Sequence, residues 1–192
     1  MKNFFKKYFD YYSEVLIKSI DNKKLLLTIK LLKSTKKRKK KVIIFGNGGS
    51  ASIASHFSVD LIKNTKIRCI NFNEANLLTC FSNDFGYKNW MKKALEFYGD
   101  KGDVLILISS SGQSENVNKC ALEAKKKGFL KVITFTGFNK NNPLRSKGNI
   151  NFWVNSKIYN YVENVHQIML LSIIDSLTFD LKNKWIKYKI LK

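Results

Sequence analysis

VIIFGNGGSASIASHFSVD, residues 42–60, is the stretch that decides the fold. Its first four residues are apolar, GNGGS is a glycine-rich turn, and the remainder is typical of a helix. A strand that leads through glycines into a helix favours an anion-binding loop, because free backbone N–H groups and the positive end of the helix dipole face the ligand. The stretch therefore predicts a phosphate site, and it places His56, one of two histidines, directly behind that site.

The composition is that of one globular domain. The chain has 192 residues, of which 44% are hydrophobic, enough for one sizeable core. Its apolar runs are shorter than the ~20 residues of a membrane span, and its first residues lack a signal-peptide core. The three cysteines (Cys69, Cys80 and Cys120) are widely spaced, which favours buried, reduced thiols. We therefore expect a cytoplasmic protein with no membrane partner.

The charge is strongly positive, at +21. Lysines are spread over almost every segment, and the one dense cluster is STKKRKKK at residues 34–41. A single basic run before a strand is typical of a solvated connection, so we expect no nucleic-acid partner. If nucleic acid did bind at residues 36–41, a strong salt dependence would be its signature.

Short apolar runs alternate with helical patterns along the chain. This alternation, with strands that are solidly apolar, predicts an α/β fold of three αβα layers, in which helices cover both faces of a parallel sheet. We expect a single domain over 1–192, with N-terminal helices in 1–38, an α/β core with a C-terminal helix in 39–182 and a basic tail in 183–192. The expected strands are 42–45, 67–72, 104–109, 131–136 and 150–154, and the expected helices after residue 38 are 51–63, 75–82, 87–98, 115–127 and 159–181.

A second loop repeats the design of the first. Residues 103–116 read DVLILISSSGQSEN, again a strand, a turn of small polar residues and a helix start. Taken alone, the first loop also fits a dinucleotide fingerprint, with Gly46, Gly48 and Ala51 at the required spacing and Glu74 as the ribose carboxylate. The serine-dense second loop favours a monophosphate instead, because several donors must converge on three acceptor oxygens.

Together with SHFSVDL (55–61), SNDFGY (82–87) and VENVHQ (162–167), these loops resemble the sugar isomerase (SIS) family, and within it the enzymes that isomerise phosphorylated heptoses. The resemblance covers nearly the whole chain. It implies a five-stranded sheet, a homotetramer or dimer, and conversion of a ketose phosphate, sedoheptulose 7-phosphate, into D-glycero-D-manno-heptose 7-phosphate. The implied phosphate ligands are Ser50, Ser109, Ser110, Ser111 and Ser114, and the implied sugar contacts are Asn47, Gly48 and Asp84.

The resemblance also implies an acid–base group on two helices. The corresponding positions are His56, Asp60, Glu163 and Leu171, and Leu171 stands where the family uses a histidine. Some members hold zinc at these positions, so a zinc site of His56, Asp60 and Glu163 stays open.

The spacing of these residues supports such a group. His56 and Asp60 are four apart, and Glu163 and His166 are three apart, so each pair lies on one face of a helix. If the two helices face each other, the four side chains could perform acid–base chemistry or bind zinc. Two alternatives remain: the histidines are structural, or the protein is a non-catalytic SIS-type regulator that binds a phosphosugar or a protein, which Leu171 favours.

Overall fold

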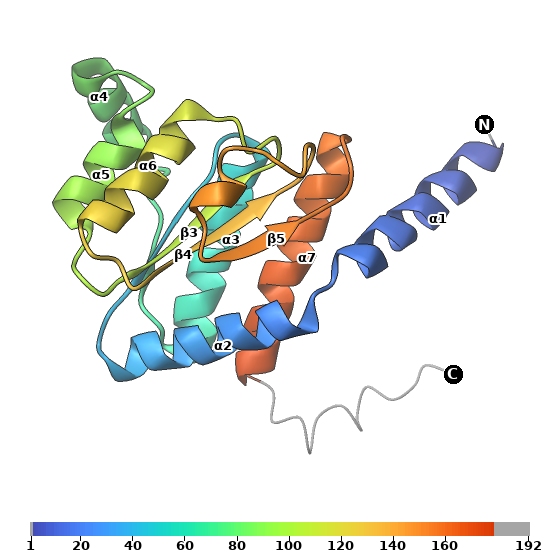
Figure 1. Cartoon of the computed structure of the whole chain (residues 1–192), viewed down its shortest axis with the longest axis horizontal. Helices are drawn as coiled ribbons and strands as arrows, with labels where there is room; N and C mark the ends of the chain where they lie inside the picture. The colour runs from blue at the N-terminus through green and yellow to red at the C-terminus, as the bar shows by residue number, and fades with distance from the viewer. Residues whose placement is uncertain (1, 179–192) are drawn as a thin grey trace.

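A computed structural model describes residues 2–178 and shows a five-stranded parallel sheet between layers of helices (Figure 1). The strands, which pair in the order β2-β1-β3-β4-β5, are β1 (Val42–Phe45), β2 (Cys69–Ile70), β3 (Val104–Ser109), β4 (Lys131–Thr136) and β5 (Ile150–Trp153). The helices are α1 (Lys2–Ser19), α2 (Asn22–Lys37), α3 (Gly49–Thr65), α4 (Ala75–Phe85), α5 (Trp90–Tyr98), α6 (Glu115–Lys126) and α7 (Tyr159–Thr178), with a short 3₁₀ helix η1 (Arg145–Lys147).

The α/β architecture with a parallel sheet is confirmed, and β1, β3 and β4 have the expected bounds. The second strand is shorter than expected, because only two of its residues pair with β1. Helix α3 begins earlier than expected, at Gly49, because the glycine-rich turn forms its first turn. The expected end of the late helix and the basic tail 183–192 lie outside the described residues.

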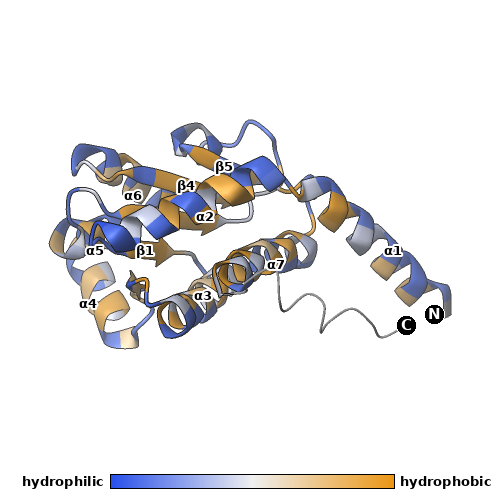
Figure 2. Ribbon diagram, turned by 90° about the horizontal axis from the view of Figure 1, so that it is seen from below, coloured by the Kyte–Doolittle hydropathy of each residue, from blue (hydrophilic) through white to orange (hydrophobic). Residues whose placement is uncertain are grey.

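Alternate residues of the central strands enter two separate cores. Val104, Ile106 and Ile108 of β3 face α3 and α7, whereas Leu105 and Leu107 face α5 and α6. All five side chains are fully buried. Because both faces of the sheet are covered (Figure 2), the central strands β1 and β3 are almost entirely apolar rather than alternating.

The cysteines do not share one environment. Cys69 and Cys120 are buried, and burial raises the pKa of both thiols, so they stay protonated and apolar in character. The prediction of a buried thiol is wrong for Cys80, which is exposed on α4, a helix without buried residues. The Cys80 thiol lies 3.5 Å from the Asp84 carboxylate, which raises its pKa.

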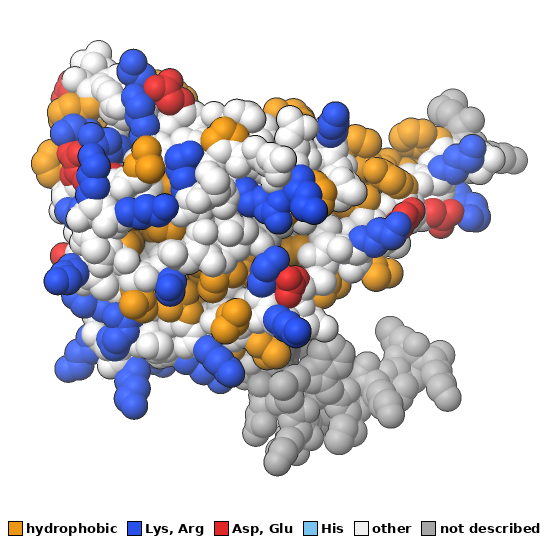
Figure 3. Space-filling view, viewed as in Figure 1, with side chains coloured by type: hydrophobic (Ala, Val, Ile, Leu, Met, Phe, Trp, Pro, Cys, Tyr) orange, Lys and Arg blue, Asp and Glu red, His pale blue; other side chains and the backbone are white. Residues whose placement is uncertain are grey.

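Helix α1 extends away from the body of the molecule (Figure 1). Its main anchor is Tyr161 of α7, whose ring lies between 4.8 and 5.8 Å from those of Tyr8, Tyr11 and Tyr12. Further out, the helix leaves large apolar side chains in solvent, visible as orange atoms in Figure 3. No helix among residues 2–178 is long and apolar enough to cross a membrane.

Candidate functional site

The strand order places the two predicted loops side by side. β1 is the neighbour of β3, with Val42 paired to Val104 and Phe45 to Leu107. The helices that follow these two strands cover opposite faces of the sheet, an arrangement in which α/β proteins bind ligands at the carboxyl ends of the strands. We call residues 46–50 and 109–114, which form the two loops at these ends, the serine cradle.

The first half of the cradle is built on glycine. Gly48 caps α3 with a φ of 55°, a conformation that other residues rarely adopt. At Gly46 a side chain would collide with the backbone of Ser50, since a Cβ there would lie 2.5 Å from the carbonyl carbon. Ser50 itself is buried in the first turn of α3.

Asn47 joins the two halves of the cradle. Its side-chain amide exchanges two hydrogen bonds of 3.0 Å with the amide of Asn116, at the start of α6. The Tyr87 hydroxyl donates a third, of 3.1 Å, to Asn47 Oδ1. Asn47 was predicted to contact the sugar, but Asn116 and Tyr87 were not assigned roles. Both lie inside quoted motifs, although nothing in their spacing predicts these contacts.

The second half of the cradle carries the serines. Ser109 and Ser110 are almost fully buried, and the Ser109 hydroxyl lies 3.3 Å from that of Ser114. The Ser111 hydroxyl accepts a hydrogen bond from the Gln113 backbone at 3.2 Å. The backbone turns at Gly112, whose φ is 69°. The hydroxyls of Ser109 and Ser114 thus lie together within the second loop.

Glu163 lies against both halves of the cradle. The Ser110 hydroxyl donates to Glu163 Oε1 at 3.4 Å. A side chain at Gly49 would collide with the same carboxylate, so the start of α3 packs directly on Glu163. The start of α7 is thereby placed against the two loops, with the Glu163 carboxylate beside the expected phosphate site.

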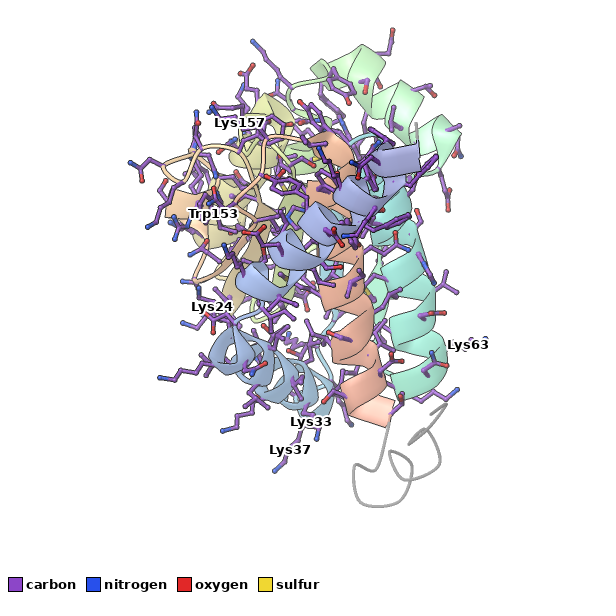
Figure 4. All side chains as sticks on the ribbon, turned by 90° about the vertical axis from the view of Figure 1, so that its right-hand side faces the viewer. Lys24, Lys33, Lys37, Lys63, Trp153 and Lys157 are labelled. Atoms are coloured by element: carbon purple, nitrogen blue, oxygen red, sulfur yellow. The ribbon has the colours of Figure 1, made fainter. Side chains whose placement is uncertain are left out.

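His56 and Asp60 lie further along α3, on the side that faces α7 (Figure 4 shows the two helices side by side). His56 Nε2 is 3.3 Å from Asp60 Oδ2, and His56 Nδ1 is 3.4 Å from the amide nitrogen of Gln167. Since an amide nitrogen can only donate, Nδ1 accepts from it and Nε2 carries the proton that faces Asp60. Gln167 was not predicted to take part, although it lies one helical turn after Glu163.

The structure does not bring His166 to this group. Its side chain is fully buried, its Nε2 donates to the Thr136 carbonyl at 3.1 Å, and its ring packs edge-on against Phe135. Burial lowers its pKa to about 4, so the ring is neutral at neutral pH. These contacts favour the alternative of a structural histidine for this residue.

Two further positions make their contacts outside the cradle. Leu171 is partly buried and packs on the core beneath α3 and α7, as an apolar side chain would be expected to do. The Asp84 carboxylate accepts a hydrogen bond from Asn83 and contacts Cys80 on α4. The segment after α4 reaches the cradle instead through Tyr87.

The donor set does not fit zinc within one chain. Among residues 2–178, no three His, Cys, Asp or Glu side chains lie close enough to share a metal ion. His56 and Asp60 form a pair, while Glu163 is engaged with Ser110 and Gly49. Leu171 is apolar and cannot bind a metal. Only two possible zinc ligands, His56 and Asp60, therefore lie together among the described residues, whereas a catalytic zinc requires three protein ligands.

Comparisons with known proteins agree with this geometry. The model of the SIS domain family matches residues 5–137. A phosphoheptose isomerase of Thermodesulfovibrio yellowstonii is 35% identical over 146 residues, which cover 71% of this chain and 72% of the relative. A phosphoheptose isomerase of Cytophaga hutchinsonii is 44% identical over 97 residues, but that match covers 48% of this chain and spans only about half, 50%, of the relative's length.

The fold also matches solved structures. The phosphoheptose isomerase of Francisella tularensis superimposes with a TM-score of 0.84, over 91% of this chain and 96% of that one. At 24% identity this likeness establishes the shared fold alone.

Proposed function

The chain belongs to the SIS domain family, and we propose that it is a cytoplasmic phosphosugar isomerase of heptose biosynthesis. We propose that it interconverts a ketose phosphate and an aldose phosphate, with sedoheptulose 7-phosphate and D-glycero-D-manno-heptose 7-phosphate as the pair. The observation that carries this proposal is the position of Glu163, whose carboxylate packs on both halves of a serine-lined anion site. The similarity to phosphoheptose isomerases supports the same activity.

In this proposal the serine cradle holds the phosphate. The N-terminus of α3 supplies backbone N–H groups and the positive end of its dipole. The serine hydroxyls supply further donors without adding a fixed charge. The amide pair of Asn47 and Asn116 fixes the two loops relative to each other, so the donors are in place before the sugar arrives.

The reactive end of the sugar would lie toward His56. Seven residues of helix separate Gly49 from His56, which is about 10 Å along the axis at 1.5 Å per residue. An extended seven-carbon chain reaches further from its phosphate than a short sugar does, so this separation favours a long substrate. Asp60 would take the proton from one carbon, and His56, which is paired with it, would serve the neighbouring oxygen. Glu163 stays at the phosphate end, beside Ser110 and Gly49.

We also propose that the chain assembles with copies of itself, as a homotetramer or dimer. Phe4, Phe5 and Phe9 of α1 are each at least 60% exposed. Large apolar side chains gathered on a helix that extends into solvent are typical of an interaction surface. A second copy of the same helix would bury them.

Deuterium exchange tests the isomerase proposal. Purified protein is incubated with sedoheptulose 7-phosphate in deuterated water and followed by NMR. We expect deuterium at the C1 and C2 carbons and a growing aldose signal. Asp60→Asn should slow the exchange at least a hundredfold, in the range of a lost general base, about 10² to 10⁴. Asp175→Asn, an exposed carboxylate on α7, is the matched control and should exchange at the normal rate.

A non-catalytic phosphosugar-binding regulator is the second candidate, and Leu171 is the observation that favours it, since it provides no proton-transfer group. This candidate predicts saturable phosphosugar binding with no deuterium incorporation. Binding in either case should be lost when Ser109 and Ser111 are both changed to alanine. Exchange that persists unchanged in Asp60→Asn would contradict the proposed base.

A further inference from the structure

The lysine run before β1 meets a second basic segment in space. Lys36 Nζ donates to the Thr65 carbonyl at 2.7 Å, and the Arg68 guanidinium contacts the carbonyl of Lys39. The C-terminal ends of α2 and α3 are thereby held together. We call the surface formed by residues 33–40 and 63–68 the basic pole.

The basic pole is rich in exposed cations. Its exposed cations include Lys33, Lys37, Lys39, Lys63, Lys66 and Arg68. Among the described residues, no salt bridge involves any side chain of the pole. The nearby carboxylates of Asp100 and Asp103 are bound to Lys41, at 2.6 and 2.7 Å. The positive electrostatic potential of the basic pole is therefore exposed to solvent.

The pole lies at the opposite end of the sheet from the serine cradle. Its two segments lead into β1 and β2, so they lie where the parallel strands begin, whereas the cradle lies where β1 and β3 end. Lys33, Lys37 and Lys63 point outward at this end in Figure 4, and basic side chains crowd the lower left of Figure 3. A partner bound here would leave the cradle open.

We propose that the basic pole binds the phosphate backbone of duplex nucleic acid. A single lysine run is typical of a solvated connection between two elements. Two basic segments joined into one surface can instead contact several phosphates of a nucleic-acid backbone. Neither segment, KSTKKRKK at 33–40 nor KNTKIR at 63–68, contains an aromatic residue on which an unpaired base could stack. Contacts to the backbone without base contacts imply binding that is independent of sequence. This inference does not rest on the isomerase proposal.

The test compares two variants of equal charge. In one, three pole lysines are neutralised (Lys37→Gln, Lys39→Gln and Lys63→Gln). In the other, three exposed lysines at the opposite end are neutralised (Lys88→Gln, Lys140→Gln and Lys157→Gln). The affinity of the full chain for a short duplex DNA of arbitrary sequence is measured by fluorescence anisotropy over a series of salt concentrations. Thermal melting shows that each variant is folded.

We expect the pole variant to bind at least about tenfold more weakly, and its log–log salt slope to fall by about three, roughly one per lysine. The control variant should keep both values close to those of the unaltered chain. Equal losses in the two variants would overturn the proposal, because net charge alone would then explain binding. Weak duplex binding together with pole-dependent binding to anionic lipid vesicles would also overturn it, in favour of a membrane surface.

Discussion

The serine cradle and the facing sides of α3 and α7 contribute to one site, but they are built differently. In the cradle, each loop is fixed by several contacts, including the Asn47–Asn116 amide pair and the packing of Gly49 on Glu163. Between the helices, the His56 side chain is about half exposed, and its polar partners within residues 2–178 are Asp60 and Gln167, at 3.3 and 3.4 Å. The phosphate end is thus preorganised by many contacts, whereas the reactive end is held by few.

The largest effect is expected from breaking the cradle at Gly112. Its φ of 69° is unfavourable for other residues, and a Cβ there would collide with the Asn142 side chain. Gly112→Ala should therefore weaken phosphosugar binding beyond detection in calorimetry. Gly86→Ala is the matched control, because its φ is 78° but a Cβ there meets no atom within 4 Å. Its φ of 78° and ψ of 144° lie in a region essentially restricted to glycine, so the variant would carry backbone strain of about 1–3 kcal/mol without a collision. Similar losses in both variants would show that strain, rather than the cradle's packing, matters.

A smaller effect is expected at the buried histidine behind the cradle. The pKa of His166 is lowered to about 4 by burial, while an unfolded histidine has a pKa of about 6.5. Above about pH 6.5 both states are neutral, and as the pH falls toward 4 only the unfolded state binds the proton. The free energy of unfolding should therefore fall by about 3 kcal/mol over this range.

His166→Gln removes this titration. Denaturant unfolding at several pH values should show that the variant, although less stable at pH 7, loses about 3 kcal/mol less than the unaltered protein between pH 7 and pH 4. Parallel pH curves for the two proteins would mean that His166 keeps an ordinary pKa in the folded state.

The smallest effect is expected at Tyr87, on the rim of the cradle. Tyr87→Phe removes one hydrogen bond to Asn47, and a bond of this kind contributes about 0.5–1.5 kcal/mol. Phosphosugar affinity measured by calorimetry should fall about threefold, with the fold intact. Tyr98→Phe removes an exposed hydroxyl that makes no hydrogen bond within residues 2–178, and it should change nothing. A large loss in Tyr87→Phe would mean that this hydroxyl contacts the ligand itself.

The fold was predictable from the sequence because it depends on patterns that are local. Apolar runs such as 104–109 and the glycine turn at 46–49 each indicate their own structure. The serine cradle was predictable from the same stretches, because parallel strands place their carboxyl ends, and the loops that follow them, at one edge of the sheet.

The second part of the site was less predictable because it depends on how two helices rotate against each other. His166 and Gln167 are adjacent in the chain, yet one is fully buried and the other faces His56. The spacing of Glu163 and His166 allows both side chains to lie on one face of α7. The packing of α7 shows that the face turned toward His56 carries Gln167 rather than His166. The exposure of Cys80 could not be foreseen for the same reason, because α4 touches the body on one side only.

The pairing of β1 with β3 has a consequence for how the protein acquires its site. Val42 pairs with Val104, so the two halves of the cradle are distant in the chain and meet only after a long loop has closed. Such non-local contacts form slowly, because the entropy of closure is lost before they can stabilise the chain. A fragment of the chain that contains only one half of the serine cradle should therefore not bind a phosphosugar. Ligand binding during refolding would therefore report the moment at which the centre of the sheet has formed, and a bound phosphosugar would slow the separation of these two strands.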